Sequence, residues 1–176
     1  MEKIYNLTNM KDSEIEEVVT RVKALLMDKS RNVIFASSGG GIQLTGGHVE
    51  EGETNEQGLV REVMEETGIA LDPSKIQKPF FRVAHYTRNH KVSHKNRLSQ
   101  IYYYYVPINE APNLSRAHLT EHEKENNFCL RTLPYAEFVQ ELKVVRQTAP
   151  QDFNRVIADE LLQALASLYL PEVQND

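Results

Sequence analysis

Three closely spaced glutamates are the residues of this chain that most clearly predict chemistry. Glu62, Glu65 and Glu66 stand at i, i+3 and i+4, so a helix would place them on one face. Like charges within one turn repel each other, and these also lie near the negative, C-terminal end of the expected helix. A divalent cation would turn that repulsion into coordination, because carboxylate oxygens suit hard ions such as Mg²⁺ or Mn²⁺. The spacing therefore predicts a divalent-metal site.

A solvated helix face is the simpler explanation, and it would account for one or two of these residues. It does not account for seven glutamates between Glu50 and Glu66 with Arg61 as the only basic residue among them. We therefore favour the metal site.

The residues around the glutamates set the limits of the helix. Thr54 and Gln57 form a capping box, which predicts that the helix begins at Thr54. Gly68 stands where a left-handed residue ends a helix. Gly58 lies inside it, where glycine costs roughly 1 kcal/mol relative to alanine, so we expect a bulky group nearby or a less stable helix. Gly46 and Gly47 precede it and allow the backbone a close approach to a ligand.

The segment from residue 47 to 69 resembles the signature of the Nudix hydrolases, G-x5-E-x7-R-E-U-x-E-E-x-G-U, where U is a bulky aliphatic residue. All nine specified positions match: Gly47, Glu53, Arg61, Glu62, Val63, Glu65, Glu66, Gly68 and Ile69. So many matches in about an eighth of the chain make the motif specific.

The resemblance implies an enzyme that hydrolyses a nucleoside diphosphate linked to another group, X, with Mg²⁺ as cofactor and Mn²⁺ as a substitute. It implies that Glu62, Glu65 and Glu66 are metal ligands, with the Gly46 carbonyl as a further candidate. Arg61 and Glu53 are then expected to form an ion pair that orients the carboxylates. The substrate would be a nucleoside triphosphate, a nucleotide sugar or a dinucleoside polyphosphate.

The general base is left open by the motif, since it is either a motif glutamate or an acid on a later loop. Glu121, Glu123 and Glu125 are the later candidates, although an ordinary charged loop is the better explanation of any one of them.

Residues 82–97 carry a local excess of basic side chains in an acidic protein. We expect this loop to contact the phosphates or the X group, with Arg82 and Arg88 as the charged contacts. Tyr86 lies roughly where some dinucleoside polyphosphate hydrolases of the family carry a tyrosine. A solvated hairpin loop is an equally good explanation of the same residues.

Composition excludes several other classes of function. The net charge of −5 argues against nucleic acid as a partner. A single cysteine excludes an intrachain disulfide, and the neighbours of Cys129 suggest that it is buried. The N-terminus lacks the apolar region of a signal peptide, and no window has 18 apolar residues, so we expect a cytoplasmic protein without a membrane span.

Short runs of β-branched and aromatic residues, separated by turn-forming residues, predict strands at 18–27, 33–36, 42–44, 81–87, 99–106 and 127–131. Amphipathic spacing predicts later helices at 134–145 and about 152–170, the second capped by Asp152. The Tyr102–Tyr105 run favours a core strand over the alternative of a stacking face for a base. This order also resembles the Nudix fold, so we expect one domain over residues 1–176, an α/β/α sandwich with a mixed sheet. The final helix and the N-terminal segment either pack on this core or form a homodimer.

Two other functions use the same fold. A nucleotide sensor without turnover is the main alternative, although such proteins usually lose a motif glutamate and none is missing here. Decapping would need a basic path for RNA, and an isomerase would need a catalytic cysteine. The complete motif favours the hydrolase.

Overall fold

The computed structural model of the chain describes residues 1–38, 41–149 and 153–168. Within them, one mixed sheet contains seven strands. The strands are β1 (Glu2–Tyr5), β2 (Glu17–Met27), β3 (Asn32–Ser38), β4 (Gly41–Gln43), β5 (Phe81–Thr87), β6 (Arg97–Pro107) and β7 (Cys129–Pro134). Their order is β1-β5-β6-β2-β3-β4, and β7 pairs with β3. The pairs β1–β5 and β2–β6 are parallel, and the other pairs are antiparallel.

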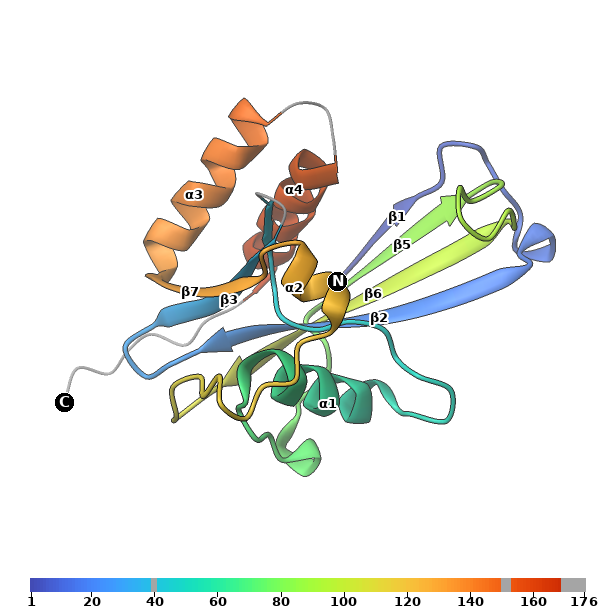
Figure 1. Cartoon of the computed structure of the whole chain (residues 1–176). Coiled ribbons are helices and arrows are strands. Elements are labelled where there is room, and N and C mark those ends of the chain that lie inside the picture. The colour runs from blue at the N-terminus through green and yellow to red at the C-terminus, as the bar shows by residue number, and fades with distance from the viewer. Residues whose placement is uncertain (39–40, 150–152, 169–176) are drawn as a thin grey trace.

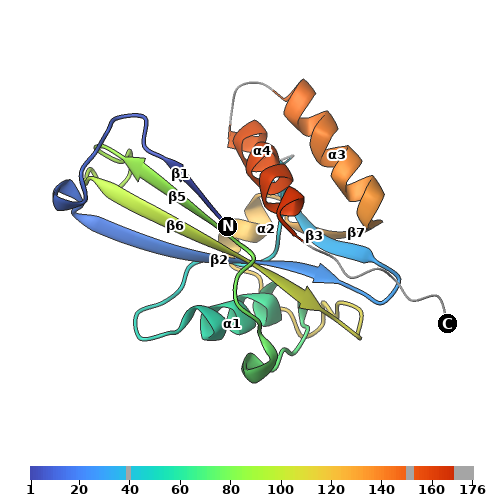
Figure 2. The same cartoon turned by 180° about the vertical axis from the view of Figure 1, so that it is seen from behind.

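Helices cover both faces of this sheet (Figures 1 and 2). They are α1 (Asn55–Thr67), α2 (Glu121–Glu125), α3 (Tyr135–Thr148) and α4 (Phe153–Ala166), with short 3₁₀ turns at Asp12–Glu14 and Pro73–Lys75. The helix α1 lies on one face, and α3 and α4 lie together on the other. The expected α/β/α sandwich is confirmed.

Each face has its own hydrophobic core. Leu59 and Val63 of α1 pack on alternate side chains of β2 and β6. Phe138 and Leu142 of α3, together with Leu161 of α4, pack on the opposite face. The final helix thus packs on the core of its own chain, which is one of the two arrangements left open above.

The tyrosine run shows how one strand serves both cores. Tyr103 belongs to the core under α3 and α4, whereas Tyr104 belongs to the core over α1. Successive side chains of a strand point to opposite faces, and both rings are buried. The prediction of a core strand is confirmed.

The predicted elements agree with the structure to within a few residues. The strand 81–87 and the caps of α1 at Thr54 and Gly68 are reproduced, whereas β7 runs further than expected, to Pro134. The strand β1 and the short helix α2 were not predicted, because four or five residues carry too little periodicity. The predicted cap at Asp152 lies outside the described residues, and the last helix ends at Ala166, before the predicted end near residue 170. No helix in the described ranges is long and apolar enough to cross a bilayer.

The prediction for Cys129 was wrong, because this side chain is exposed. It begins β7, which pairs along its length with β3 and carries few buried side chains. Apolar sequence neighbours do not bury a residue at the start of such a strand.

Residues 45–49 lie along β2 on the side that β6 leaves free. The amide of Val22 donates to the Gly47 carbonyl at 3.0 Å, and the amide of Ala24 donates to the Thr45 carbonyl at 2.9 Å. A left-handed φ of +121° at Gly46 makes this path possible, and a side chain there would overlap the Val22 carbonyl. This segment therefore lies beside β2 and in contact with Glu66 of α1.

Candidate active site

The backbone at Gly46 and Gly47 is where two carboxylates of α1 converge. Glu66 is only 6% exposed, and its Oε2 accepts a hydrogen bond of 2.8 Å from the Gly46 amide. A β-carbon at Gly47 would overlap the carboxylate of Glu62. The glycines therefore let the backbone lie directly against the acidic face of the helix.

The guanidinium of Arg61 connects the loop before α1 to the carboxylates of the helix. It donates to both oxygens of Glu53, at 2.8 and 3.0 Å, and to the His48 carbonyl at 2.8 Å. It also contacts Glu62 at 2.9 Å and Glu65 at 3.2 Å. This arrangement agrees with the expected Glu53–Arg61 ion pair, which here ties the loop before α1 to the carboxylates.

The pKa shifts of Glu53 and Glu62, two of the three acids that contact Arg61, have opposite directions. The hydrogen bond from Arg61 lowers the pKa of Glu53, so this carboxylate stays ionised and binds the guanidinium firmly. Burial raises the pKa of Glu62 despite its contact with Arg61. At Glu62 the effect of burial therefore exceeds that of the neighbouring guanidinium.

Gly58 has a steric explanation in the structure. A β-carbon there would lie 3.1 Å from Oε2 of Glu53 and 3.3 Å from a methyl of Val49. The loop before α1 packs closely against this turn of the helix. The absence of a side chain at Gly58 leaves space for Glu53, at the cost of a lower helix propensity.

The donor set suits a hard divalent cation, although its carboxylates do not meet at one point. In the part of the chain that the structure describes, no group of three or more His, Cys, Asp or Glu side chains is arranged to hold a metal ion. Glu62 and Glu65 contact Arg61, and Glu66 contacts the Gly46 amide. All three nevertheless lie on one helix face against a backbone cradle, and oxygen ligands of this kind match Mg²⁺ or Mn²⁺.

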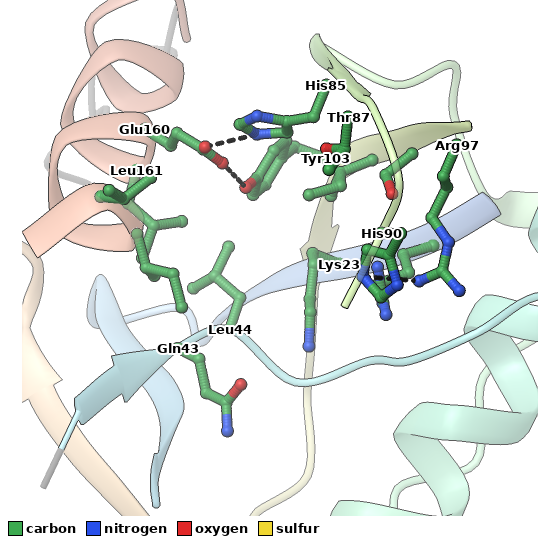
Figure 3. A pocket seen from close by; sticks show the side chains of 15 residues that line it. Lys23, Gln43, Leu44, His85, Thr87, His90, Arg97, Tyr103, Glu160 and Leu161 are labelled. Atoms are coloured by element: carbon green, nitrogen blue, oxygen red, sulfur yellow. Dashed lines mark hydrogen bonds and ion pairs between the residues drawn. The ribbon is translucent and has the colours of Figure 1, made fainter. Parts of the chain in front are cut away.

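A cavity of about 430 Å³ lies on the other face of β2, between the sheet and α4. Its lining comes from β2, β5, β6, the hairpin after β5, the β4 region and α4 (Figure 3). Leu44, Ile101 and Leu161 give it aliphatic walls. This volume is within the range of small-molecule sites.

The β2 side of the cavity is basic. Lys23 donates to the Gly46 carbonyl and so links the cavity to the glutamate site. Arg97 forms an ion pair of 2.6 Å with Glu17 and lies 3.1 Å from the ring of His90. Burial lowers the pKa of Arg21, and repulsion by Arg97 adds to this effect. Such a cluster of cations favours an anionic ligand.

The α4 side of the cavity carries a buried acid. Glu160 is 4% exposed and lies 2.6 Å from Nε2 of His85, with the hydroxyl of Tyr103 at 3.5 Å (Figure 3). Burial, then the charge of Glu160, raises the pKa of Tyr103, so that its hydroxyl stays protonated. The cavity thus has cations on one side and a carboxylate on the other.

The basic loop is divided by the structure. Arg82 pairs with Glu2 at 3.0 Å, Arg88 with Glu14 at 2.7 Å, and Tyr86 donates to Asp12 at 2.9 Å. None of these three side chains lines the cavity. Arg82 and Tyr86 are on the face of β5 opposite to His85 and Thr87, and Arg88 follows the strand and is exposed. His85, Thr87, His90 and Arg97 of the same region do line the cavity.

The later acids are not brought to the glutamate site by any described contact. Glu121 is exposed and pairs with Lys124 at 2.7 Å, and Glu125 is exposed. Glu123 lies in α2, but its side chain is outside the described part of the chain.

Arg21, Lys23 and Glu160 are site residues that the sequence reasoning missed. A signal was present: Arg21 and Lys23 alternate with the buried Val22 and Ala24, and Glu160 interrupts the apolar stripe of the last helix. Charged residues on faces that become buried deserve the same weight as a motif.

Comparison with known proteins agrees with this architecture. Residues 15–151 match the model of the NUDIX domain. The chain belongs to the NUDIX domain family. It is therefore a Nudix hydrolase, acting on phosphoric anhydride bonds. A search of curated proteins returned no match.

Solved structures similar to this Nudix chain show the same fold at low identity. One is a MutT structure described for Aliivibrio salmonicida and Vibrio cholerae, with a TM-score of 0.52, 16% identity, and coverage of 86% of this chain and 98% of that one. Another is the NUDIX domain of Shewanella oneidensis NrtR bound to ADP ribose, with a TM-score of 0.55, 17% identity, and coverage of 91% and 94%. A third is a bifunctional NMN adenylyltransferase/ADP ribose pyrophosphatase of Francisella tularensis with AMP and a Mn ion, with a TM-score of 0.51, 17% identity, and coverage of 83% and 42%.

Proposed function

We propose that this Nudix hydrolase cleaves a nucleoside diphosphate linked to another group, and that the cavity beside α4 holds the nucleotide. The observation that carries the proposal is the Lys23–Gly46 contact, which joins a basic cavity to the acidic face of α1. An anionic chain held by the cations on β2 would then reach the carboxylates across the glycine segment.

Glu62, Glu65 and Glu66, with the Gly46 carbonyl, would hold a divalent cation, Mg²⁺ or Mn²⁺. The bound cation supplies charge neutralisation for the phosphates and a lower pKa for a water molecule. The Mn ion and AMP in the Francisella tularensis structure support this ligand class. Arg61 positions the carboxylates through its contacts with Glu53 and Glu65.

The side chains of the cavity account for substrate binding. Arg21, Lys23 and Arg97 would neutralise the phosphates, and charge-assisted hydrogen bonds would fix their orientation. The aliphatic walls exclude water from the nucleoside. We infer that a small nucleotide, and not a nucleic acid, is the substrate in the cell, and that the enzyme acts in the cytoplasm.

A screen that separates the reaction products by chromatography tests the proposal, because the expected products are a nucleotide with either pyrophosphate or X-phosphate. Nucleoside triphosphates, nucleotide sugars, ADP-ribose and dinucleoside polyphosphates would be offered with Mg²⁺ or Mn²⁺ to the native protein and to Glu66→Gln. The matched control is Glu51→Gln, which removes a charge from an exposed residue of the same segment. Metal-dependent turnover that is lost in Glu66→Gln and kept in Glu51→Gln supports the proposal.

A nucleotide sensor is the second candidate, since the similar NUDIX domain of NrtR was solved in complex with ADP ribose. Binding of a nucleotide by calorimetry, without turnover of any class in either metal, would favour the sensor over the enzyme proposed here.

A further inference from the structure

Glu160 is a buried carboxylate that the proposed hydrolysis does not use. It lies on α4, far in sequence from the Nudix motif, and lines the cavity while being 4% exposed. Neighbouring cavity residues on α4 are apolar, among them Ile157 and Leu161. An ionised carboxylate in such a place is costly unless its oxygens are satisfied.

Among the described residues, one oxygen of Glu160 has a close partner and the other has a distant one. Oε1 lies 2.6 Å from Nε2 of His85, and the ring of His85 is held by stacking on Tyr5, with centroids 4.7 Å apart and planes 5° apart. Oε2 has the Tyr103 hydroxyl at 3.5 Å, which is long for a hydrogen bond between oxygens. A structural role as the partner of His85 explains Oε1, but it leaves Oε2 with unused acceptor capacity.

The orientation of the cavity indicates which part of a nucleotide would meet this acid. Cations on the β2 side, next to Gly46, would attract the phosphates. Glu160 lies on the α4 side, with His85 and Tyr103 (Figure 3). The nucleoside is the uncharged end of the ligand, so its base would lie between the aliphatic walls and near the carboxylate.

We propose that Glu160 selects the base, and that the selected base presents two adjacent N–H donors, as guanine does at N1 and its 2-amino group. This inference rests on the proposed function. An ionised carboxylate only accepts hydrogen bonds, and its two oxygens offer about four acceptor sites. Oε1 can therefore accept one donor of the base beside His85 while Oε2 accepts the parallel donor. Adenine and cytosine place an acceptor nitrogen beside their amino group, and uracil has one donor between two carbonyl oxygens. Each of these bases would set an acceptor against the carboxylate.

Inosine triphosphate provides a test on the unaltered protein, because it keeps the N1–H and lacks the 2-amino group. We expect kcat/KM for GTP to exceed that for inosine triphosphate by about 10- to 100-fold, the size of a lost hydrogen bond to a charged group. ATP, CTP and UTP should lie at or below inosine triphosphate. Equal turnover of GTP and inosine triphosphate, or a preference for ATP, would overturn the proposal.

The variant Glu160→Gln should remove the preference for GTP over inosine triphosphate, because an amide offers one acceptor and one donor. Asp159→Asn is the matched control: Asp159 is the preceding residue of α4, pairs with Arg146, and does not line the cavity. It should keep the native ratio. Thermal unfolding of each variant checks that the fold is retained.

Two failures are distinguishable. Turnover that depends on Glu66 but shows the same GTP to inosine triphosphate ratio in Glu160→Gln and in the native protein contradicts the base-selection proposal alone. Absence of all turnover contradicts the proposed function, and calorimetric binding of GMP and IMP then decides the role of Glu160. Tighter binding of GMP, lost in Glu160→Gln, supports that role, whereas equal binding overturns it.

Discussion

The acidic helix α1 and the cavity beside α4 lie on opposite faces of one sheet, and they are built in different ways. The residues of the first site follow each other within a single motif and are oriented by one helix and one arginine. The residues of the cavity come from β2, β5, β6 and α4, which the topology brings together. The residues proposed for hydrolysis are therefore positioned by local sequence spacing. The residues proposed for substrate selection are positioned by packing between segments that are distant in the chain.

This difference has a functional consequence. A change in the α1 site should lower the turnover of every substrate by a similar factor, because all substrates share the phosphoric anhydride. A change in the cavity should alter the ratio between substrates or their KM. Kinetics on variants of the two sites would separate these two behaviours.

Glu62→Gln should lower kcat/KM by about 10³-fold for every substrate, since a lost metal ligand removes several kcal/mol of stabilisation. The ratio between substrates should stay unchanged, in contrast to Glu160→Gln. Steady-state kinetics on two substrates of different base would measure both quantities. A loss of kcat/KM that differs between the substrates would contradict the proposal that the α1 site acts on all substrates alike and the cavity selects among them.

The free energy of unfolding at high pH reports on the burial of Tyr104 in the core over α1. Burial, followed by the charge of Glu56, raises the pKa of Tyr104 to about 12. The neutral hydroxyl therefore stabilises the fold fully below the ordinary pKa of about 10, and this contribution is lost as the pH rises towards about 12. The contribution of Tyr104 to the free energy of unfolding that is lost over this pH range is at most about 3 kcal/mol.

Tyr104→Phe removes that titration, so its unfolding free energy in urea should fall less than that of the native protein between pH 10 and 12. Parallel curves for the two proteins would show that Tyr104 ionises as easily in the fold as in the unfolded chain. Tyr103→Phe makes the same comparison for the opposite face.

Arg21→Met should raise KM by about 10- to 100-fold with little change in kcat, because the lost contact is a charge-assisted hydrogen bond to a phosphate. The variant should also be more stable, by about 1 kcal/mol or about 2–4 °C in Tm, since burial and Arg97 disfavour the Arg21 charge in the fold. Kinetics and calorimetry measure the two effects. A loss of both stability and kcat would indicate a structural role for Arg21.

Arg88→Met should have the smallest effect. Its guanidinium pairs with Glu14 on the exposed side of the hairpin, and pairs of this kind contribute little. We expect kcat/KM to change by less than about 2-fold and Tm to stay the same, which makes this variant the control for Arg21→Met. A rise in KM comparable to that of Arg21→Met would restore Arg88 to the substrate site.

The amino-acid sequence by itself determined the acidic helix and the class of fold. The caps at Thr54 and Gly68, the spacing of Glu62, Glu65 and Glu66, and the Glu53–Arg61 pair depend on residues a few positions apart. Such features follow from local backbone geometry, so a short sequence motif is enough to predict them. Strand positions were predicted for the same reason, since alternation is a local signal.

The tertiary structure decided which of the other polar residues belong to a site. Arg82, Arg88 and Arg97 look alike in the sequence. In the structure, Arg82 pairs with Glu2 and Arg88 pairs with Glu14, and neither lines the cavity. Arg97 does line it. Exposure of Cys129 and burial of Glu160 likewise follow from which strand or helix packs beside them. The free energy of burying or pairing a side chain depends on neighbours that are distant in the chain, and no local pattern encodes those neighbours.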